Sequence, residues 1–506
     1  MTTPAYPNPL LPGFNPDPSV VEVDGEYYLV TSTFEYLPGL PVYHSSDLVT
    51  WTQIGNVATR PGQLNVSEIP TGGGVWAPTI RYREGTFYVI VVVAMGGGCL
   101  LYTATDPAGP WSDPTSVTGF DGIDPDLAWG DDGTAYVTYS GLETNGGDMH
   151  EHKGIQQVEI DLATGAALTP PTSLYSGTGL KFPEAPHLYH RGEWWYLMIA
   201  EGGTERGHGV SIARGAAPDG PFEGYANNPF LSARSTNRPI QNTGHADLVT
   251  RPDGGDALVL LGMRPRGGTQ AFSALGRETF ITTIEWVDGW PVAEPVVLNP
   301  RAGGTDEHID FANTPELDDA WMGVRRRAVD LAAFENGTLV LDGDGTTLED
   351  ARPTFIGRRQ LSQTARVTTT VDVAAGVGGL AVRYDEKHFV QVEAAGGGAG
   401  ASTTVTGRYQ LSGLFQEWSA TLPAGDVTLE IDAVPVVMTG FDSNFLSPDT
   451  IVLRASAGGE SVTLAELDGR YLTAETAGSF TGRVVGLYAV SGRVAFSGYD
   501  AVGSED

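Results

Sequence analysis

The chain has 506 residues, of which 62 are acidic and 29 are basic, so its formal net charge at pH 7 is −33. A surface of this charge repels phosphate groups, and we therefore expect neither nucleic acid nor a membrane as partner. The single cysteine, Cys99, excludes an internal disulfide. No apolar run approaches the roughly 20 residues of a membrane span. The first residues lack the basic and apolar parts of a secretory signal, which leads us to expect a cytoplasmic protein.

Residues 1 to about 300 contain five copies of one short pattern. Each copy opens with an acidic residue, a tryptophan or a histidine, continues with a β-rich run and reaches a turn at a glycine. The turn glycines are Gly25, Gly85, Gly133, Gly192 and Gly255. A repeat of roughly 50 to 60 residues, made of short β-runs and turns, is typical of a propeller with one sheet per copy. The sequence therefore predicts a five-bladed β-propeller over residues 1–303.

The repeat stops near residue 300. Residues 299–306 are polar and rich in turn formers, which indicates a linker. Beyond it, runs of alternating polarity are separated by glycine-rich turns, and these runs are 338–341, 365–371, 380–384, 427–431, 450–453 and 484–488. This rhythm favours a two-sheet β-sandwich of jelly-roll or concanavalin-like type over residues 304–506. The predicted fold class is all-β, a propeller followed by a C-terminal sandwich.

The residues that open the five copies are expected to meet at the propeller axis, because the first strand of each blade lines that axis. They are Asp17, Trp76, Asp124, Glu184 and His245. Two carboxyl groups from different blades suit the hydrolysis of an acetal, where one protonates the leaving oxygen and the other acts as base or nucleophile. We select Asp17 and Glu184 as this pair, since neighbouring prolines stiffen the backbone at both positions.

Asp124 is the third acid of the set. Its charge is expected to raise the pKa of Glu184, to keep that group protonated near neutral pH and to orient it. Asp126 would face the same way along a strand and competes for this role, but Asp124 matches the repeat. An acid before a proline is more commonly a turn or strand-start residue, and recurrence at one register is what favours catalysis here.

Three further residues suit recognition of a sugar. Trp76 can stack on a sugar face or belong to the core, and Arg277 can bond neighbouring hydroxyl groups or pair with an acid. His245 can bond a hydroxyl, ligate a central cation or its waters, or be a core residue. No cluster of His and Cys has the spacing of metal ligands, so we assign no metal site and expect no required cofactor. If a cation binds, we expect Ca²⁺ near His245.

Eight stretches, in order, resemble glycoside hydrolase family 43, in particular its two-domain β-xylosidases of the β-xylosidase/α-L-arabinofuranosidase type. These stretches are 13–19, 32–39, 75–78, 122–125, 184–189, 200–204, 244–246 and 275–279. The resemblance runs through the whole predicted propeller and extends more weakly through the sandwich. It implies a five-bladed propeller, in agreement with the repeats, and hydrolysis in a single step with inversion.

The resemblance also implies roles. Asp17 is expected to be the general base, Glu184 the general acid and Asp124 the residue that tunes and orients the acid, with base and acid roughly 6.5–9.5 Å apart. Four residues are similar to those that shape the sugar subsite, namely Phe34, Trp76, Thr204 and Arg277. In this subgroup the second domain adds an aromatic residue to the pocket mouth, for which Phe480 is the candidate. Asp126 stands where relatives often carry serine.

The implied function is an exo-acting, inverting glycoside hydrolase that releases D-xylose from the non-reducing end of β-1,4-xylo-oligosaccharides, a xylan 1,4-β-xylosidase. An α-L-arabinofuranosidase, or an enzyme with both activities, is the alternative, because the two sugars can present similar hydroxyl groups to one pocket. A non-catalytic carbohydrate-binding propeller is a third hypothesis, which the three acids disfavour. The expected partner is a small oligosaccharide, and relatives often form homo-oligomers.

Overall fold

The computed structural model describes residues 6–142, 152–268, 271–301, 305–396, 401–436, 446–478 and 480–505. The chain divides into two compact units, and each is described here by itself. The first unit comprises Met1–Leu11, Asn15–Arg264 and Glu278–Pro300, and the second comprises Pro12–Phe14, Pro265–Arg277 and Arg301–Asp506. Two short segments of the predicted propeller region, 12–14 and 265–277, are thus grouped with the second unit.

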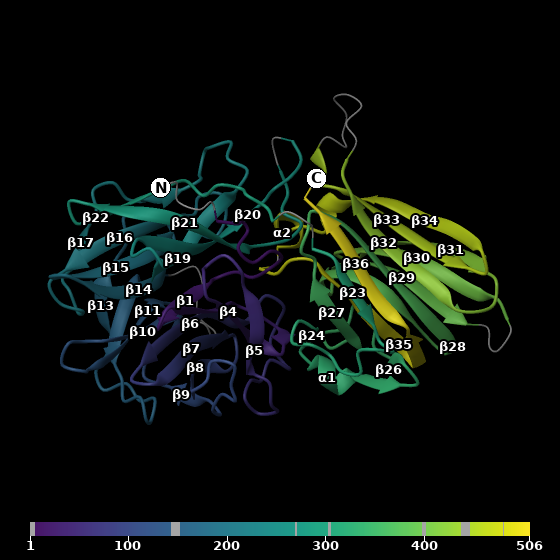
Figure 1. Cartoon of the computed structure of the whole chain (residues 1–506), viewed down its shortest axis with the longest axis horizontal. Coiled ribbons are helices and arrows are strands. Elements are labelled where there is room, and N and C mark those ends of the chain that lie inside the picture. The colour runs from purple at the N-terminus through teal and green to yellow at the C-terminus, as the bar shows by residue number, and fades with distance from the viewer. Residues whose placement is uncertain are drawn as a thin grey trace. The chain divides into compact units, whose positions relative to one another are not determined.

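The first unit is a five-bladed β-propeller, as the repeats predict (Figure 1). Every blade is an antiparallel sheet, and the first strands of neighbouring blades contact one another around the axis. Blades 1 and 2 contain β1 (Ser19–Val23), β2 (Glu26–Val30), β4 (Gly39–Ser45) and β5 (Thr52–Ala58), then β6 (Gly74–Arg83), β7 (Thr86–Ala94), β8 (Gly98–Ala104) and β9 (Thr115–Val117). The short β3 (Tyr36–Leu37) lies between β2 and β4 in the chain.

The remaining blades follow the same order in the chain. Blade 3 contains β10 (Gly122–Trp129), β11 (Ala135–Gly141), β12 (Ile155–Glu159) and β13 (Thr172–Tyr175). Blade 4 contains β14 (Glu184–Arg191), β15 (Trp194–Glu201), β16 (Gly209–Gly215), β17 (Glu223–Gly224) and β18 (Leu231–Ser232). Blade 5 contains β19 (Gln241–Thr250), β20 (Asp256–Met263), β21 (Glu278–Val287) and β22 (Trp290–Ala293).

The turn after each innermost strand explains the repeated glycine. In blade 1, Asp24 and Gly25 both have positive φ, 53° and 85°, which is the backbone of a two-residue type I′ hairpin turn. Glycine adopts this conformation without the clash that a Cβ atom brings. In blade 5 the glycine with positive φ is Gly254 (83°), so the fifth turn lies one residue before the predicted Gly255.

The N-terminal segment joins blade 5 to the start of the chain. The side-chain amide of Asn8 donates to the carbonyl of Ile281 and accepts from its N–H, both at 2.9 Å. Leu11 forms a backbone bridge with Thr279. These bonds bring the segment that precedes blade 1 onto the last blade, and so they help close the propeller.

The second unit contains the β-sandwich. Its strands are β23 (Glu307–Asp310), β24 (Met322–Val324), β25 (Ala332–Glu335), β26 (Thr338–Asp344), β27 (Phe355–Arg359), β28 (Thr364–Asp385), β29 (His388–Gly396), β30 (Thr403–Leu411), β31 (Leu414–Leu422), β32 (Val427–Val434), β33 (Thr450–Ala457), β34 (Glu460–Asp468), β35 (Val484–Phe496) and β36 (Gly498–Ser504). In the described part of the unit, the short helices α1 (Ala328–Leu331), η2 (Gly469–Tyr471) and α2 (Ala474–Ala477) accompany them.

One strand of the sandwich differs from expectation. The predicted runs 365–371 and 380–384 are the two parts of the single long strand β28. Its first part pairs with β32 and β36, and its second part pairs with β29. The Gly- and Ala-rich segment between the runs therefore forms no turn but an irregular stretch within β28, where the register with β35 shifts.

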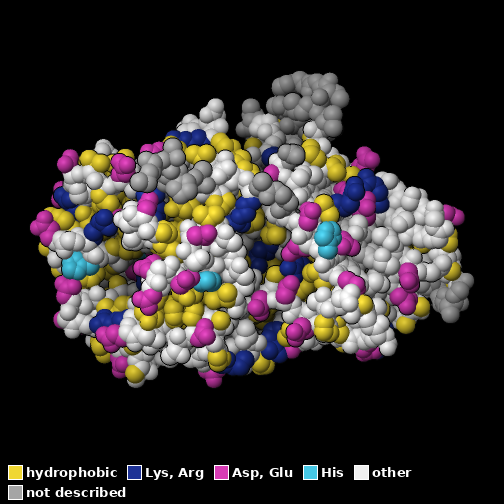
Figure 2. All heavy atoms as spheres, in the orientation of Figure 1, with side chains coloured by type: hydrophobic (Ala, Val, Ile, Leu, Met, Phe, Trp, Pro, Cys, Tyr) yellow, Lys and Arg dark blue, Asp and Glu magenta, His cyan; other side chains and the backbone are white. Residues whose placement is uncertain are grey.

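Two further properties concern the distribution of acidic side chains on the surface and the length of the helices. Acidic side chains are spread over the face seen in Figure 2 and do not gather in one patch there. In the described part of the chain, no helix is long and apolar enough to cross a membrane. On this face the acidic side chains are interspersed with basic and apolar ones.

Candidate active site

One residue near the start of each innermost strand has a left-handed backbone. These residues and their φ angles are Asp17 (55°), Ala77 (41°), Asp124 (54°), Ala185 (50°) and His245 (49°). Positive φ is uncommon for residues other than glycine and costs about 1–3 kcal/mol at each position. In β6, β10, β14 and β19 the pairing register shifts at the same place. The same backbone bend therefore recurs where the five blades approach the axis.

This bend corrects the register that was predicted from the repeats. Asp17, Asp124 and His245 occupy the bent position itself, whereas Trp76 and Glu184 lie one residue before it. The equivalent residues in those two blades are Ala77 and Ala185, each followed by a proline, as Asp17 and Asp124 are. Glu184 thus begins β14 from a different backbone position than the two aspartates. It does not occupy the position that recurs in the other blades.

Asp17 is buried and held by neighbours from other strands. The hydroxyl of Ser32 donates to Asp17 Oδ2 at 2.6 Å, and the same hydroxyl oxygen accepts from Ala77 N–H at 2.7 Å. Nδ1 of His245 lies 3.6 Å from Asp17 Oδ1. Contacts from blades 1 and 5 therefore hold this carboxylate, and blade 2 holds the Ser32 hydroxyl that bonds it, as a general base requires.

Asp124 is attached to the strand that carries Glu184. Oδ2 of Asp124 accepts a hydrogen bond from Ala185 N–H at 3.0 Å, one residue beyond Glu184. On the other side of Glu184, the carbonyl of Pro183 accepts from the hydroxyl of Ser140 at 2.7 Å. Asp124 is buried and Glu184 half-buried. Blade 3 thus holds the backbone on both sides of Glu184.

Phe34, in the loop between β2 and β3, lies against β6, the strand that carries Trp76. Phe34 is buried, has a φ of 53°, and forms a backbone bridge with Val75. Gly74 permits this approach, because a Cβ atom there would lie 2.3 Å from the Phe34 carbonyl oxygen. The indole N–H of the half-buried Trp76 donates to the Gly72 carbonyl at 2.8 Å, which fixes the ring.

Thr204 connects the loops of blades 4 and 5. Its carbonyl accepts from the side-chain amide of Asn242 at 3.1 Å, and Asn242 lies on the same strand as His245. The loop that carries Thr204 begins directly after Glu201, which pairs along β15 and β16 with Gly209. This places Thr204 at the end of blade 4 from which β14 starts, since Ala200 pairs with Glu184.

Arg277 and Phe480 come together within the second unit. The guanidinium carbon of Arg277 lies 5.2 Å from the centre of the Phe480 ring, and Arg277 Nη2 donates to the Phe480 carbonyl at 3.4 Å. The next residue, Thr481, is held through its carbonyl by the hydroxyl of Tyr384 at 2.9 Å. A cation over an aromatic face is a favourable pair. The part that both residues play in substrate binding stays a prediction.

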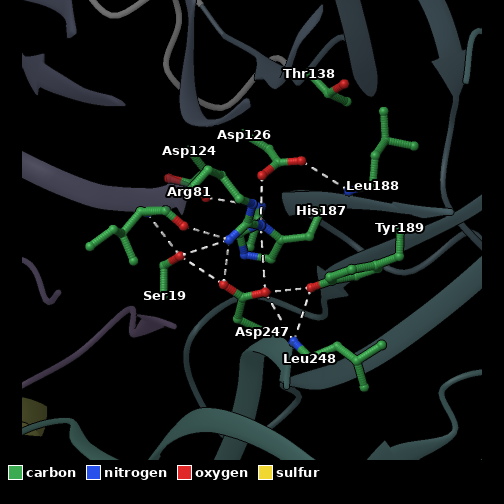
Figure 3. A network of polar contacts seen from close by, with 12 residues as sticks. Ser19, Arg81, Asp124, Asp126, Thr138, His187, Leu188, Tyr189, Asp247 and Leu248 are labelled. Carbon is green, nitrogen blue, oxygen red and sulfur yellow. Dashed lines mark hydrogen bonds and ion pairs between the residues drawn. The ribbon is translucent and has the colours of Figure 1, made fainter. Parts of the chain in front are cut away.

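A buried polar network further along the innermost strands was not predicted (Figure 3). Its centre is Arg81, whose guanidinium contacts Asp126 at 2.7 Å and Asp247 at 2.8 Å. Burial by itself raises the pKa of each carboxyl, but the charge of Arg81 and the hydrogen bonds that each carboxylate accepts together outweigh it and hold the pKa of Asp126 and Asp247 below the usual range. The same network contains His187, whose Nδ1 lies 2.9 Å from Arg81 Nη2.

Asp124 and Asp126, which compete for one role in the sequence analysis, have different partners in the structure. Asp124 contacts the backbone beside Glu184, whereas Asp126 contacts Arg81 and accepts from Leu188 N–H at 2.9 Å. A sequence signal for the network exists, since Asp126 follows Asp124 by two residues and Asp247 follows His245 by two. Side chains two apart on a strand share a face, but the common partner, Arg81, is distant in sequence.

The residues around His245 bear on the expectation that Ca²⁺ binds there. Within the described ranges, no three or more His, Cys, Asp or Glu side chains are placed together to hold a metal ion. His245 and Asp17 form a pair with one contact of 3.6 Å. A Ca²⁺ ion would need several further oxygen ligands there, so Ca²⁺ near His245 stays a prediction, and no step of the chemistry is assigned to it.

A five-bladed propeller with fixed carboxylates at its axis, followed by a β-sandwich, defines a glycoside hydrolase. The chain belongs to glycosyl hydrolases family 43, which its residues 6–291 match. Residues 308–499 match the beta xylosidase C-terminal concanavalin A-like domain. The predicted family, fold and class of enzyme are thereby confirmed.

Relatives of known name resemble both units. A non-reducing end alpha-L-arabinofuranosidase of Bacteroides ovatus is 35% identical over 513 residues, which cover 96% of this chain and 91% of that protein. A beta-xylosidase of Bacillus subtilis is 36% identical over 330 residues, 62% of each chain. The crystal structure of a xylan beta-1,4-xylosidase from Bacillus halodurans matches with a TM-score of 0.86 and 27% identity, over 98% of this chain and 100% of that one.

Proposed function

We propose that this protein is an exo-acting, inverting β-xylosidase that releases D-xylose from the non-reducing end of β-1,4-xylo-oligosaccharides. The observation that carries the proposal is the bond from Ala185 N–H to Asp124, which ties one buried acid to the strand of Glu184 while Asp17 is held separately by Ser32. Two separately mounted acids and a third that orients one of them suit inverting hydrolysis. The beta-xylosidases among the relatives support xylose as the sugar.

In the proposed reaction Asp17 is the general base and Glu184 the general acid. The Asp17 carboxylate takes a proton from a water molecule while the oxygen of that water attacks the anomeric carbon. The bond from this carbon to the bridging oxygen breaks as Glu184 gives its proton to that oxygen. The products are xylose of inverted configuration and the shortened oligosaccharide. Asp124 orients Glu184 through the backbone of Ala185.

The first unit also supplies candidate groups for the sugar. We propose that the half-buried Trp76 provides apolar surface to the ring of the bound sugar, since sugar faces pack on aromatic side chains, and that the buried Phe34 shapes the same subsite. Thr204 and His245 are the candidate partners of its hydroxyl groups. Trp76 is fixed by its bond to Gly72, so its ring needs little ordering when a sugar binds.

An α-L-arabinofuranosidase is the second candidate function. The observation that favours it is the match to a protein named as a non-reducing end alpha-L-arabinofuranosidase, which is 35% identical over a stretch that covers 96% of this chain. Both candidates use the same acid, base and pocket, so an enzyme with both activities fits equally. The choice between them depends on which sugar the pocket receives in the transition state.

The experiment is a comparison of kcat/KM for xylobiose with that for an α-L-arabinofuranosyl disaccharide. We expect the larger value for xylobiose. A larger value for the arabinofuranoside would replace the first candidate by the second. Binding of xylobiose without hydrolysis of either sugar would contradict both candidates and favour a carbohydrate-binding propeller.

A further inference from the structure

The innermost strands are linked by hydrogen bonds one layer away from the candidate catalytic carboxyls. In three blades, the residue two positions after the backbone bend accepts a bond from the main chain of the next blade. These bonds run from Ile80 N–H to Ser19 Oγ (3.1 Å), from Leu188 N–H to Asp126 Oδ2 (2.9 Å) and from Val20 N–H to Asp247 Oδ2 (3.0 Å). They join blade 1 to 2, blade 3 to 4 and blade 5 to 1.

The two other junctions are linked by longer side chains. The hydroxyl oxygen of Tyr189 in blade 4 accepts from Leu248 N–H in blade 5 at 3.0 Å. Arg81 in blade 2 contacts Asp126 in blade 3 at 2.7 Å. Every junction between neighbouring blades therefore carries a bond of this layer, which we name the axial ring and define as Ser19, Arg81, Asp126, Tyr189 and Asp247 (Figure 3).

The axial ring is internally paired; Ser19, Asp126 and Asp247 are buried, and Arg81 and Tyr189 are half-buried. Asp126 and Asp247 have no exposed surface, and both contact Arg81. The hydroxyl of Tyr189 donates to Asp247 Oδ1 at 2.5 Å. Bonds to charged groups are stronger than those between neutral ones, and in a buried site their directions are strictly held. The ring is thus a rigid layer beneath the residues that begin the strands.

Strand β14 shows what this layer does for Glu184. Two main-chain N–H groups of β14 donate to side chains of β10, Ala185 N–H to Asp124 Oδ2 and Leu188 N–H to Asp126 Oδ2. Together with the pairing of β14 with β15, these two bonds fix where β14 lies against β10. Arg81 holds the other oxygen of Asp126, so that its Oδ2 faces Leu188.

We propose that Asp126 and Arg81 are positioning residues for the general acid, which act through β14 on the placement of Glu184. The proposal rests on the proposed function, in which Glu184 protonates the leaving oxygen. A small misplacement of an acid costs proton transfer far more than it costs binding. Loss of the Asp126 charge should therefore lower kcat for substrates that need protonation and spare those that do not.

The experiment compares two substrates with different leaving groups. Xylobiose has a poor leaving group and needs the proton of Glu184, whereas dinitrophenyl β-D-xyloside has an acidic leaving group and needs little proton donation. For Asp126→Asn we expect kcat on xylobiose to fall about 30-fold, and kcat on the aryl xyloside about 3-fold or less, with KM nearly unchanged. Arg81→Lys, which keeps the charge but not the two-pronged geometry, should give an intermediate loss of the same kind.

Asp432→Asn is the matched control. Asp432 is a buried carboxylate on β32 of the second unit, where it contacts Arg366 at 2.9 Å and also contacts Arg454. This variant should leave the ratio of the two kcat values unchanged. Circular dichroism and melting temperature establish that each variant is folded, and Arg81→Lys carries the test if Asp126→Asn is not.

The outcomes separate the two levels of the account. Hydrolysis of both substrates by the wild type, with a ratio that changes in the Asp126 or Arg81 variant and not in the control, supports the positioning role. An equal loss on both substrates would mean a merely structural role and overturn it, as would unchanged rates. If the wild type hydrolyses neither xyloside, the proposed function fails, and the positioning role fails with it.

Discussion

The carboxylate of Asp124 accepts a hydrogen bond from the main-chain N–H of Ala185 at 3.0 Å, directly beside Glu184. Both Asp124 and Ala185 have a positive φ and precede a proline, so both ends of the bond lie on backbone that has little freedom to adjust. This relationship joins blades 3 and 4 at the position where the proposed acid begins its strand. It supports an orienting role for Asp124 that does not depend on direct contact between the two carboxyl groups.

The proposed base and acid should respond differently to the leaving group. Asp17→Asn removes the base, which every substrate needs, so kcat should fall by about 10²–10⁴-fold on xylobiose and on dinitrophenyl β-D-xyloside alike. Steady-state kinetics with both substrates provide the measurement. A variant that keeps wild-type turnover of either substrate would exclude Asp17 as the base.

Glu184→Gln should show the opposite selectivity. The amide has nearly the shape of the acid but has no proton to give, so kcat on xylobiose should fall by about 10²–10⁴-fold. The aryl xyloside, whose leaving group departs without protonation, should lose much less. Equal losses on the two substrates would argue that Glu184 acts in some way other than proton donation.

Ser32 is predicted to matter for activity through Asp17. Ser32→Ala removes the hydroxyl that donates to Asp17 and leaves Ala77 N–H without this acceptor, so unfolding should become easier by about 1–3 kcal/mol. We expect kcat to fall about tenfold in addition. Ser45→Ala is the control, because the buried Ser45 bonds Asp47 away from the axis. A similar loss of kcat in both variants would speak against a specific effect on Asp17.

Stability should fall in acid because of the pair formed by Asp247 and Arg81. Burial raises the pKa of Asp247, but the charge of Arg81 and the hydrogen bonds from Arg81 and Tyr189 together outweigh it, and the folded-state pKa lies below the unfolded value of about 3.9. The stabilisation is therefore complete above about pH 4 and is lost as the pH falls towards the folded-state pKa. Urea unfolding from pH 7 to pH 2 measures this loss.

The variant Asp247→Asn isolates this contribution. It leaves Arg81 with one carboxylate partner fewer, so at pH 7 the protein should be less stable by about 3–5 kcal/mol. Its stability should then depend less steeply on pH below about pH 4. Parallel curves for the variant and the wild type in this range would contradict the assignment of the acid effect to Asp247.

Gly74 is predicted to be irreplaceable. With a φ of 95° and the Phe34 carbonyl 2.3 Å from where its Cβ would lie, Gly74→Ala should destabilise the protein by more than about 2 kcal/mol. Gly85 has a similar φ of 84° but open space around it, so Gly85→Ala should cost about 1 kcal/mol. Thermal melts compare the two, and equal costs would show that the contact with Phe34 is unimportant.

The fold could be predicted from sequence because its signals are local and repeated. Five similar segments define five blades. Turn glycines such as Gly25 mark the hairpins, because the positive φ of the turn favours glycine at that position. The sequence predicts two separate runs where the structure has the single strand β28, because a Gly- and Ala-rich segment is compatible with a turn as well as with an irregular strand. Pairing with several strands on both sides kept it continuous, and that information is not local.

The site could be predicted only in part. Asp17 and Asp124 share the bent position and the following proline, and the repeat revealed both. The predicted repeat position in blade 4 is Glu184, because its carboxyl group fits the pattern of acids, whereas the backbone bend lies one residue later, at Ala185. The spacing of two residues after Asp124 and His245 marks Asp126 and Asp247, but the axial ring stayed hidden because their common partner, Arg81, meets them only through space.

The most direct test of the account is the stereochemistry of the product. Xylobiose is mixed with the enzyme and proton NMR is recorded within the first minutes, before the released xylose equilibrates between its anomers. Inverting hydrolysis by Asp17 and Glu184 predicts that α-xylose appears first and that the β-anomer follows by mutarotation. Initial release of β-xylose would contradict the single-step mechanism and with it the assigned roles of both acids.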